Sequence, residues 1–121
     1  MAADKKQYIY KKGTDEALDA EFSAAAAYAK VRVGESVLVW KSGLRWYAIK
    51  LDSVQRIFRR VETVYGKLCC GGQTFIIEWL VLILGDGAEM VLHIGDNEQK
   101  KAEGLMLALK AAHPEIAYGK V

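Results

Sequence analysis

Residues 74–94, TFIIEWLVLILGDGAEMVLHI, contain the pattern that decides the fold of this chain. The first eleven residues are apolar and rich in β-branched and aromatic side chains, which predicts a long strand, and AEMVLHI predicts the strand that returns beside it. Asp86-Gly87 between them is a favoured two-residue hairpin turn, because both residues tolerate the positive φ that such a turn requires. The stretch therefore predicts a central β-hairpin.

Both faces of the first predicted strand are apolar, so each face needs a cover. Alternation places Glu78 on the same face as Ile76, Leu80, Leu82 and Leu84. The opposite face carries Phe75, Ile77, Trp79, Val81 and Ile83.

A helix within residues 96–113 is predicted to supply one of these covers. Asp96 and Gln99 form a capping-box pattern at its start, and Pro114 stops it at His113. Apolar residues recur at helical spacing along it and form one stripe: Ala102, Leu105, Met106, Leu109 and Ala112. The rest of the chain has to cover the other face.

A second helix is predicted near the N-terminus, over residues 15–31, DEALDAEFSAAAAYAKV. Thr14 can cap it, and the acidic Asp15 and Glu16 suit the positive end of its dipole. Its apolar stripe is narrow, so we expect it to dock lightly on the domain or on a partner: Leu18, Phe22, Ala25, Ala26 and Ala29.

Four further stretches read as strands between the two helices. They are residues 36–40 (SVLVW), 45–50 (RWYAIK), 54–65 (VQRIFRRVETVY) and 67–70 (KLCC). An amphipathic helix competes over 54–65, but the 3.6-residue stripe there is poor and the strand is favoured. Alternation in this strand puts Arg56 and Arg60 on one face and Arg59 on the other.

The composition describes one globular domain. The chain has 121 residues, of which 52% are hydrophobic and 26% are charged, so global disorder is not expected. The N-terminus lacks a signal-peptide pattern, and the longest apolar run, 79–84, is too short to cross a bilayer. We therefore expect a cytoplasmic protein with no transmembrane segment.

The charge distribution is uneven although the formal net charge is only +2. Residues 36–70 carry a local charge of +5 and residues 71–121 a local charge of −3. Such a distribution can orient the chain toward an anionic partner or a second copy, although a solvated surface is its commoner meaning.

No residues form a convincing catalytic or metal-binding pattern. The nucleophile candidates are the adjacent Cys69 and Cys70, which read as packing residues; a vicinal disulfide is the strained alternative. His93 is expected at a partly solvated strand position and His113 at the end of a helix. The zinc-site spacings C-x-x-C and H-x-x-x-H do not occur. We therefore expect no enzymatic activity, no metal and no cofactor.

The order of these predicted elements resembles that of the bacterial pleckstrin-homology-like (PH-like) domains. The resemblance covers about residues 33–119, and three stretches carry it: LDSVQRIFRR, LILGDGAEMVLHI and HPEIAYGK. It implies an α+β, mainly β fold, in which a curled antiparallel sheet forms a partly open barrel capped by the C-terminal helix. Residues 1–32 would then be an N-terminal arm and additional helix, and residues 33–121 the PH-like domain.

The resemblance implies an interaction module, because PH-like domains bind lipids, peptides or proteins and are not usually catalytic. Our leading hypothesis is a non-enzymatic module that binds a protein, including a second copy of itself as a homo-oligomer.

The alternative is binding of an anionic lipid headgroup, membrane surface or nucleic acid through basic residues. Lys41 and Arg45 match the first two basic positions of lipid-binding PH domains, but Tyr47 stands where the third would be. Alternation also breaks the basic strand into two faces, which argues against nucleic acid. The candidate ligand-binding residues are Lys41, Arg45, Arg56, Arg59 and Arg60.

Overall fold

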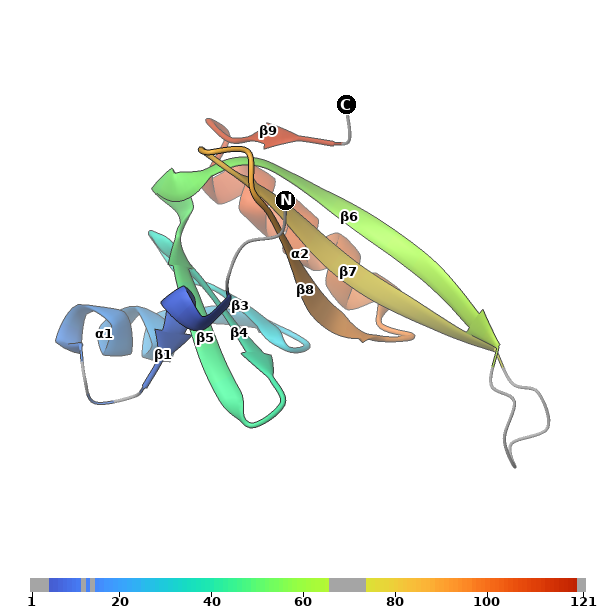
Figure 1. Ribbon diagram of the computed structural model, residues 1–121, viewed down its shortest axis with the longest axis horizontal. Coiled ribbons are helices and arrows are strands. Elements are labelled where there is room, and N and C mark those ends of the chain that lie inside the picture. The colour runs from blue at the N-terminus through green and yellow to red at the C-terminus, as the bar shows by residue number, and fades with distance from the viewer. Residues whose placement is uncertain (1–4, 12, 14, 66–73, 120–121) are drawn as a thin grey trace.

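The computed structural model describes residues 5–11, 13, 15–65 and 74–119, whose strands form two sheets (Figure 1). The first sheet has the order β1-β5-β4-β3-β2, with β1 at Ile9–Tyr10, β2 at Ala26–Tyr28, β3 at Val31–Val33, β4 at Val37–Ser42 and β5 at Arg45–Lys50. The second has the order β8-β7-β6-β9, with β6 at Val54–Tyr65, β7 at Thr74–Leu84, β8 at Glu89–Asp96 and β9 at Ala117–Tyr118. The helices are α1 (Glu16–Ala24) and α2 (Gln99–Ala112), with short 3-10 turns η1 (Lys5–Tyr8) and η2 (Leu51–Ser53).

The mainly β fold with an N-terminal and a C-terminal helix is confirmed. All strand pairs are antiparallel except β9, which runs parallel to β6. The structure does not show the expected partly open barrel: the described strands form two separate sheets, and no ladder between them closes a barrel. The expected domain boundary at 32/33 falls inside β3, and β1 and β2 belong to the same sheet as β4 and β5.

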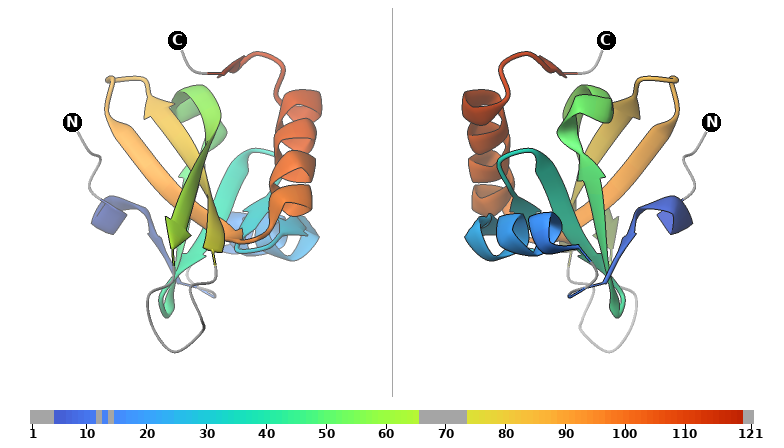
Figure 2. Two further views of the ribbon diagram at one scale, coloured as in Figure 1. Left: turned by 90° about the vertical axis from the view of Figure 1, so that its right-hand side faces the viewer. Right: turned by 90° about the vertical axis from the view of Figure 1, so that its left-hand side faces the viewer.

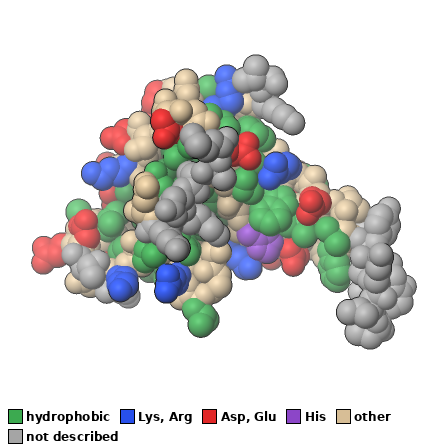
Figure 3. Space-filling model, in the orientation of Figure 1, with side chains coloured by type: hydrophobic (Ala, Val, Ile, Leu, Met, Phe, Trp, Pro, Cys, Tyr) green, Lys and Arg blue, Asp and Glu red, His purple; other side chains and the backbone are tan. Residues whose placement is uncertain are grey.

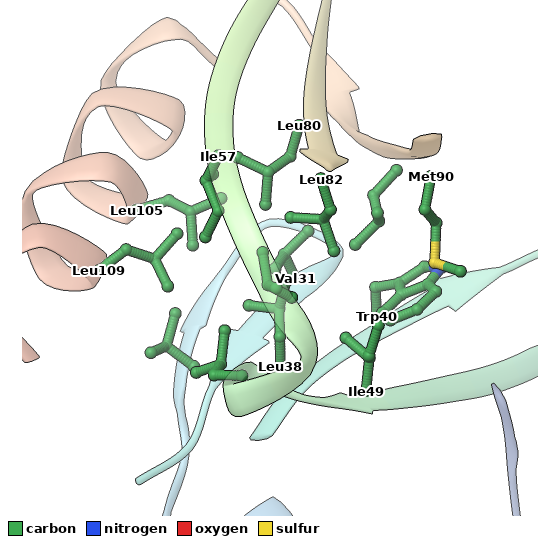
Figure 4. Packing of buried hydrophobic residues seen from close by; sticks show 14 of the residues in the cluster. Val31, Leu38, Trp40, Ile49, Ile57, Leu80, Leu82, Met90, Leu105 and Leu109 are labelled. Carbon is green, nitrogen blue, oxygen red and sulfur yellow. The ribbon is translucent and has the colours of Figure 1, made fainter. Parts of the chain in front are cut away.

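The main core lies between the two sheets and α2, which covers one face of the β6–β7–β8 sheet (Figure 2). Figure 4 shows Leu105 and Leu109 of α2 directed toward Ile57 of β6 and toward residues of the first sheet. Three residues of the stripe predicted on this helix, Ala102, Leu105 and Leu109, are buried in this core, whereas Ala112 is exposed. Fully buried side chains from both sheets complete the core: Leu38, Trp40, Ile49, Leu80, Leu82 and Met90.

A smaller cluster attaches α1 to the other face of the first sheet. Leu18 and Phe22 pack against the buried Tyr10, Val37 and Val39. Polar contacts hold the same helix, because the carboxylate of Glu21 accepts hydrogen bonds from the backbone N–H and the hydroxyl of Ser36, at 2.7 and 2.6 Å. The N-terminal helix therefore docks on the domain itself.

The predicted N-terminal helix is too long, because it ends at Ala24 and residues 26–28 form β2. Pairing of β2 with β3 overrides the helix propensity of the alanine run. The N-cap is Asp15, whose carboxylate accepts from the backbone N–H of Ala17 and Leu18, whereas the predicted cap, Thr14, lies outside the described residues.

The strand prediction over 54–65 is confirmed, with one correction to its alternation. A bulge between Val54 and Arg56 places both Val54 and Ile57 in the core. From Arg56 onward the predicted alternation holds. The predicted strand KLCC, with Cys69 and Cys70, lies outside the described residues.

The turn of the β7–β8 hairpin contains three residues rather than the predicted two. The N–H of Gly87 donates to the carbonyl of Leu84, and the N–H of Leu84 donates to the carbonyl of Ala88. Only Gly87 has positive φ (+86°), while the side chain of Asp86 accepts from the N–H of Ala88. This pattern is that of a three-residue hairpin loop with glycine in the left-handed position.

The predicted capping box of α2 is wrong, because the helix begins at Gln99 with Glu98 as its N-cap. Asp96 instead ends β8, and its carboxylate lies 2.8 Å from His93 Nε2. Asn97 extends the sheet by pairing with Ile76: its N–H donates to the Ile76 carbonyl at 2.7 Å, and its side-chain oxygen accepts from the Ile76 N–H at 3.0 Å.

The predicted stop of α2 is confirmed, because the helix ends at Ala112 with His113 as its C-cap, directly before Pro114. The tail after Pro114 then folds back on the body. Ile116 is buried, and the hydroxyl of Tyr118 donates to the carbonyls of Leu109 and His113, each at 2.8 Å.

Candidate interaction surface

The five basic candidates do not form one patch. Lys41 and Arg45 lie at the β4–β5 hairpin of the first sheet, on exposed positions, and Lys41 Nζ is 5.9 Å from the ring centroid of Trp46. The other three candidates belong to β6 in the second sheet. The predicted anionic site is therefore distributed over both sheets.

Within β6, alternation separates the arginines as expected. Arg56 and Arg60 point away from α2, whereas Arg59 points toward the core. Arg56 Nη1 donates to the carbonyl of Gly119 at 2.8 Å, so this side chain holds the C-terminal segment beside β6. Arg60 is exposed.

Arg59 is engaged inside the protein by Glu78. Its Nε donates to Glu78 Oε1 at 2.5 Å, and this hydrogen bond raises the pKa of the Arg59 guanidinium above its ordinary value. Glu78 is completely buried, and its Oε2 has no hydrogen-bond partner in the described part of the chain. A guanidinium held by a buried carboxylate is poorly suited to bind an external anion.

Sequence reasoning placed Glu78 correctly on the face with Leu80 and Leu82 but assigned it no partner. The signal was available, because Glu78 is the only charged residue in the eleven residues of β7. A buried carboxylate needs a cation. Choosing Arg59 also requires the strand register, which pairs Val61 with Glu78 and Arg59 with Leu80.

The far end of the β6–β7 hairpin projects beyond the rest of the molecule (Figure 1). Strand β8 ends at Asp96, opposite Ile77, and Asn97 pairs with Ile76, so only residues 64–65 of β6 and 74–75 of β7 continue beyond them as two strands alone. We call residues 62–65 and 74–77 the projecting ribbon. Apolar side chains are exposed along it and at its base, with Phe75 37% and Val61 48% exposed. Figure 3 shows hydrophobic side chains toward the ribbon, beside charges of both signs.

Strand β6 also has a long free edge. Its outer neighbour β9 pairs only with Arg56 and Ile57, and in the described structure no strand lies beside residues 58–65 on that side. We call residues 58–64 the free edge. A strand edge without a neighbour over this length is a surface to which another strand can add.

A cavity of about 630 Å³ lies at the other end of the domain, between η2 and the end of α2. His113 is buried at its wall, with Nδ1 3.2 Å from Glu115 Oε1 and with no hydrogen-bond partner for Nε2 among the described residues. Carboxylates of Glu35 and Asp52 and the amine of Lys50 also line this cavity. This mixture of charges selects no one class of ligand.

His93 lies elsewhere, on the face of β8 away from the core. Its ring packs on Trp79 at 5.1 Å between centroids, and its Nδ1 lies 3.2 Å from Lys30 Nζ. The two histidines therefore belong to different parts of the fold. Within residues 5–65 and 74–119, as far as they are described, no three acidic, cysteine or histidine side chains gather as a metal site.

No protein-family profile, curated protein or solved structure matches this chain. The helices of the described residues are all too short or too polar to cross a membrane.

Proposed function

We propose that this protein is a non-enzymatic, PH-like interaction module that binds a protein partner through the free edge and the projecting ribbon. The observation that carries the proposal is the free edge itself, where residues 58–64 have β7 on one side and no described strand on the other. Backbone groups on such an edge gain hydrogen bonds when a partner strand docks, and the exposed Val61 and Phe75 gain apolar contacts.

The PH-like assignment is supported by the order of elements from β4 to α2. Antiparallel strands that follow one another along the chain precede one amphipathic helix that packs on the core. Strands β1, β2, β3 and β9 and helix α1 lie outside this order of elements. The fold class supports a binding role and identifies no ligand.

The alternative, an anionic ligand bound through the basic residues, has less support from the geometry. Arg59 is paired with buried Glu78, Arg56 holds Gly119, and Lys41 and Arg45 lie on the other sheet. Exposed Arg60 is left on β6 with Glu62 two residues away.

Native mass spectrometry of the full chain over a series of salt and protein concentrations tests the proposal. We expect complexes of whole chains that persist at high salt, because strand addition and apolar contact are weakly screened. A chain that stays monomeric at every concentration, and that binds anionic vesicles only at low salt, would overturn the proposal and favour the anionic ligand.

A further inference from the structure

We infer that the free edge pairs with the same edge of a second copy, antiparallel and centred on Val61. The two four-stranded sheets then form one continuous sheet across a two-fold axis. This inference rests on the proposed function, and it names the partner and the register.

The hydrogen-bonding phase of β6 determines which residues can pair. Gly119 donates its N–H to the carbonyl of Ile57 at 3.0 Å, so the backbone of Ile57 points toward the free side of β6. Backbone direction alternates along a strand, and the N–H and C=O groups of Arg59, Val61 and Thr63 therefore point to the same side. Pairing of two free edges has to join odd-numbered residues to odd-numbered residues.

The side chains select one register among those that this phase allows. With Val61 opposite Val61 of the second copy, Arg60 lies opposite Glu62, and Glu62 lies opposite Arg60. The same register places Phe58 opposite Val64 and Arg59 opposite Thr63. Under two-fold symmetry the free edge, FRRVETV, therefore pairs basic with acidic side chains and apolar with apolar side chains.

The neighbouring registers place like charges together. Centring the pairing on Arg60 puts two arginines face to face, and centring it on Glu62 puts two glutamates face to face. Like charges directly opposite each other destabilise a strand pair. A shift toward the start of β6 also meets β9, which already occupies Ile57.

The length of the free edge fits the same register. Ile57 is bound by β9 and β6 ends at Tyr65, so among the described residues no strand lies on the outer side of residues 58–64, which have Val61 at their centre. The pairing adds on the order of six backbone hydrogen bonds across the two copies. Exposed Val61 becomes covered by its symmetry mate, which removes an apolar residue from water.

Charge exchange across this pair tests both the partner and the register. Arg60 and Glu62 are both exposed, so Arg60→Glu and Glu62→Arg should leave the monomer folded, as a circular dichroism melt checks. Each variant alone places two pairs of like charges at the interface. We expect its dimer dissociation constant in sedimentation equilibrium to rise about tenfold or more.

Mixing the two variants restores both opposite-charge pairs. The chain with Arg60→Glu is acidic at both positions, the chain with Glu62→Arg is basic at both, and each acidic position then faces a basic one. Native mass spectrometry separates the mixed dimer from either homodimer by mass, and we expect the mixed dimer to dominate. The double variant Arg60→Glu with Glu62→Arg should also recover the wild-type dissociation constant.

Two results separate failure of this inference from failure of the proposed function. If both single variants dimerise as well as the wild type, and if their mixture contains only the statistical share of mixed dimer, the β6 register is overturned. Association would then occur through another surface. Wild-type protein that is monomeric at all concentrations would overturn self-pairing and would contradict the salt-resistant complexes expected above. Lys41→Glu with Asp52→Lys, two exposed charges on the other sheet and its corner, is the matched control that should not change association.

Discussion

Arg59 Nε and Glu78 Oε1 lie 2.5 Å apart, which joins a partly buried arginine of β6 to a completely buried carboxylate of β7. The pair lies where the hairpin leaves the body of the protein, next to Val61 at the base of the projecting ribbon. A buried carboxylate is tolerated only with its cation, so Arg59 serves the structure of the hairpin rather than an external ligand.

Removing Arg59 should therefore destabilise the fold. We expect Arg59→Ala to lower the free energy of unfolding by about 3 kcal/mol, because it leaves the Glu78 carboxylate buried without a cation. Urea denaturation measures this change. Arg60→Ala, on the exposed face of the same strand, is the control and should change stability by less than about 0.5 kcal/mol. Equal effects of the two substitutions would show that the ion pair does not support the hairpin.

The two faces of α2 should respond differently to the same truncation. Leu109 is completely buried against the sheets, whereas Leu107 is 68% exposed. We expect Leu109→Ala to lower the unfolding free energy by about 2–5 kcal/mol through lost burial and a cavity, and Leu107→Ala to change it by less than about 0.5 kcal/mol. Thermal and urea denaturation of the two variants side by side check the packing of this helix.

The attachment of α1 should weaken in alkali. Burial raises the pKa of Tyr10 from 10.0 to about 12, and its hydrogen bond to Asp19 acts in the same direction. The neutral phenol is the form that the fold stabilises, so its contribution is complete below pH 10 and is lost as the pH rises toward 12. The free energy of unfolding measured across this pH range should show the loss. The substitution Tyr10→Phe should make the free energy of unfolding less dependent on pH in this range. A pH dependence that is the same in wild type and variant would contradict the assignment.

Asn97 should be sensitive to backbone geometry as well as to its side chain. Its φ is +56°, and its side-chain oxygen accepts a hydrogen bond from the N–H of Ile76. Asn97→Ala loses both the hydrogen bond and the tolerance of positive φ, so it should lower the free energy of unfolding by about 1–3 kcal/mol. Asn97→Gly keeps the backbone conformation and should lower it by less. Urea denaturation measures the stability of both variants. A smaller loss of stability in Asn97→Ala than in Asn97→Gly would contradict this prediction.

Alternation along β6, β7 and β8 allowed their faces to be predicted because each strand is long and one of its faces meets a continuous core. The short elements were harder. Ala26 and Ala27 favour a helix locally, yet they form β2 because β3 lies beside them, and that contact is invisible in local propensity. Asp96 carries a carboxylate that is able to cap a helix, but in the structure this carboxylate lies beside the ring of His93.

In the candidate site, too, some features follow from the local sequence and others depend on contacts between distant segments. The sequence predicted that Arg59 faces away from Arg56 and Arg60, because this follows from alternation alone. The partner of Arg59 depends on the register of β7, and the free edge depends on where β9 stops. Neither is encoded in a local pattern, so the sequence suggested a basic surface where the structure places a strand edge with no neighbour among the described strands.

Backbone hydrogen exchange along β6, followed by NMR at several protein concentrations, reads out self-pairing of the free edge residue by residue. We expect the N–H groups of Arg59, Val61 and Thr63 to exchange quickly in dilute protein and to become protected as concentration rises. The intervening N–H groups of Phe58, Arg60 and Glu62 face β7 and should be protected at all concentrations. Exchange at Arg59, Val61 and Thr63 that does not change between dilute and concentrated protein would contradict self-pairing of the free edge.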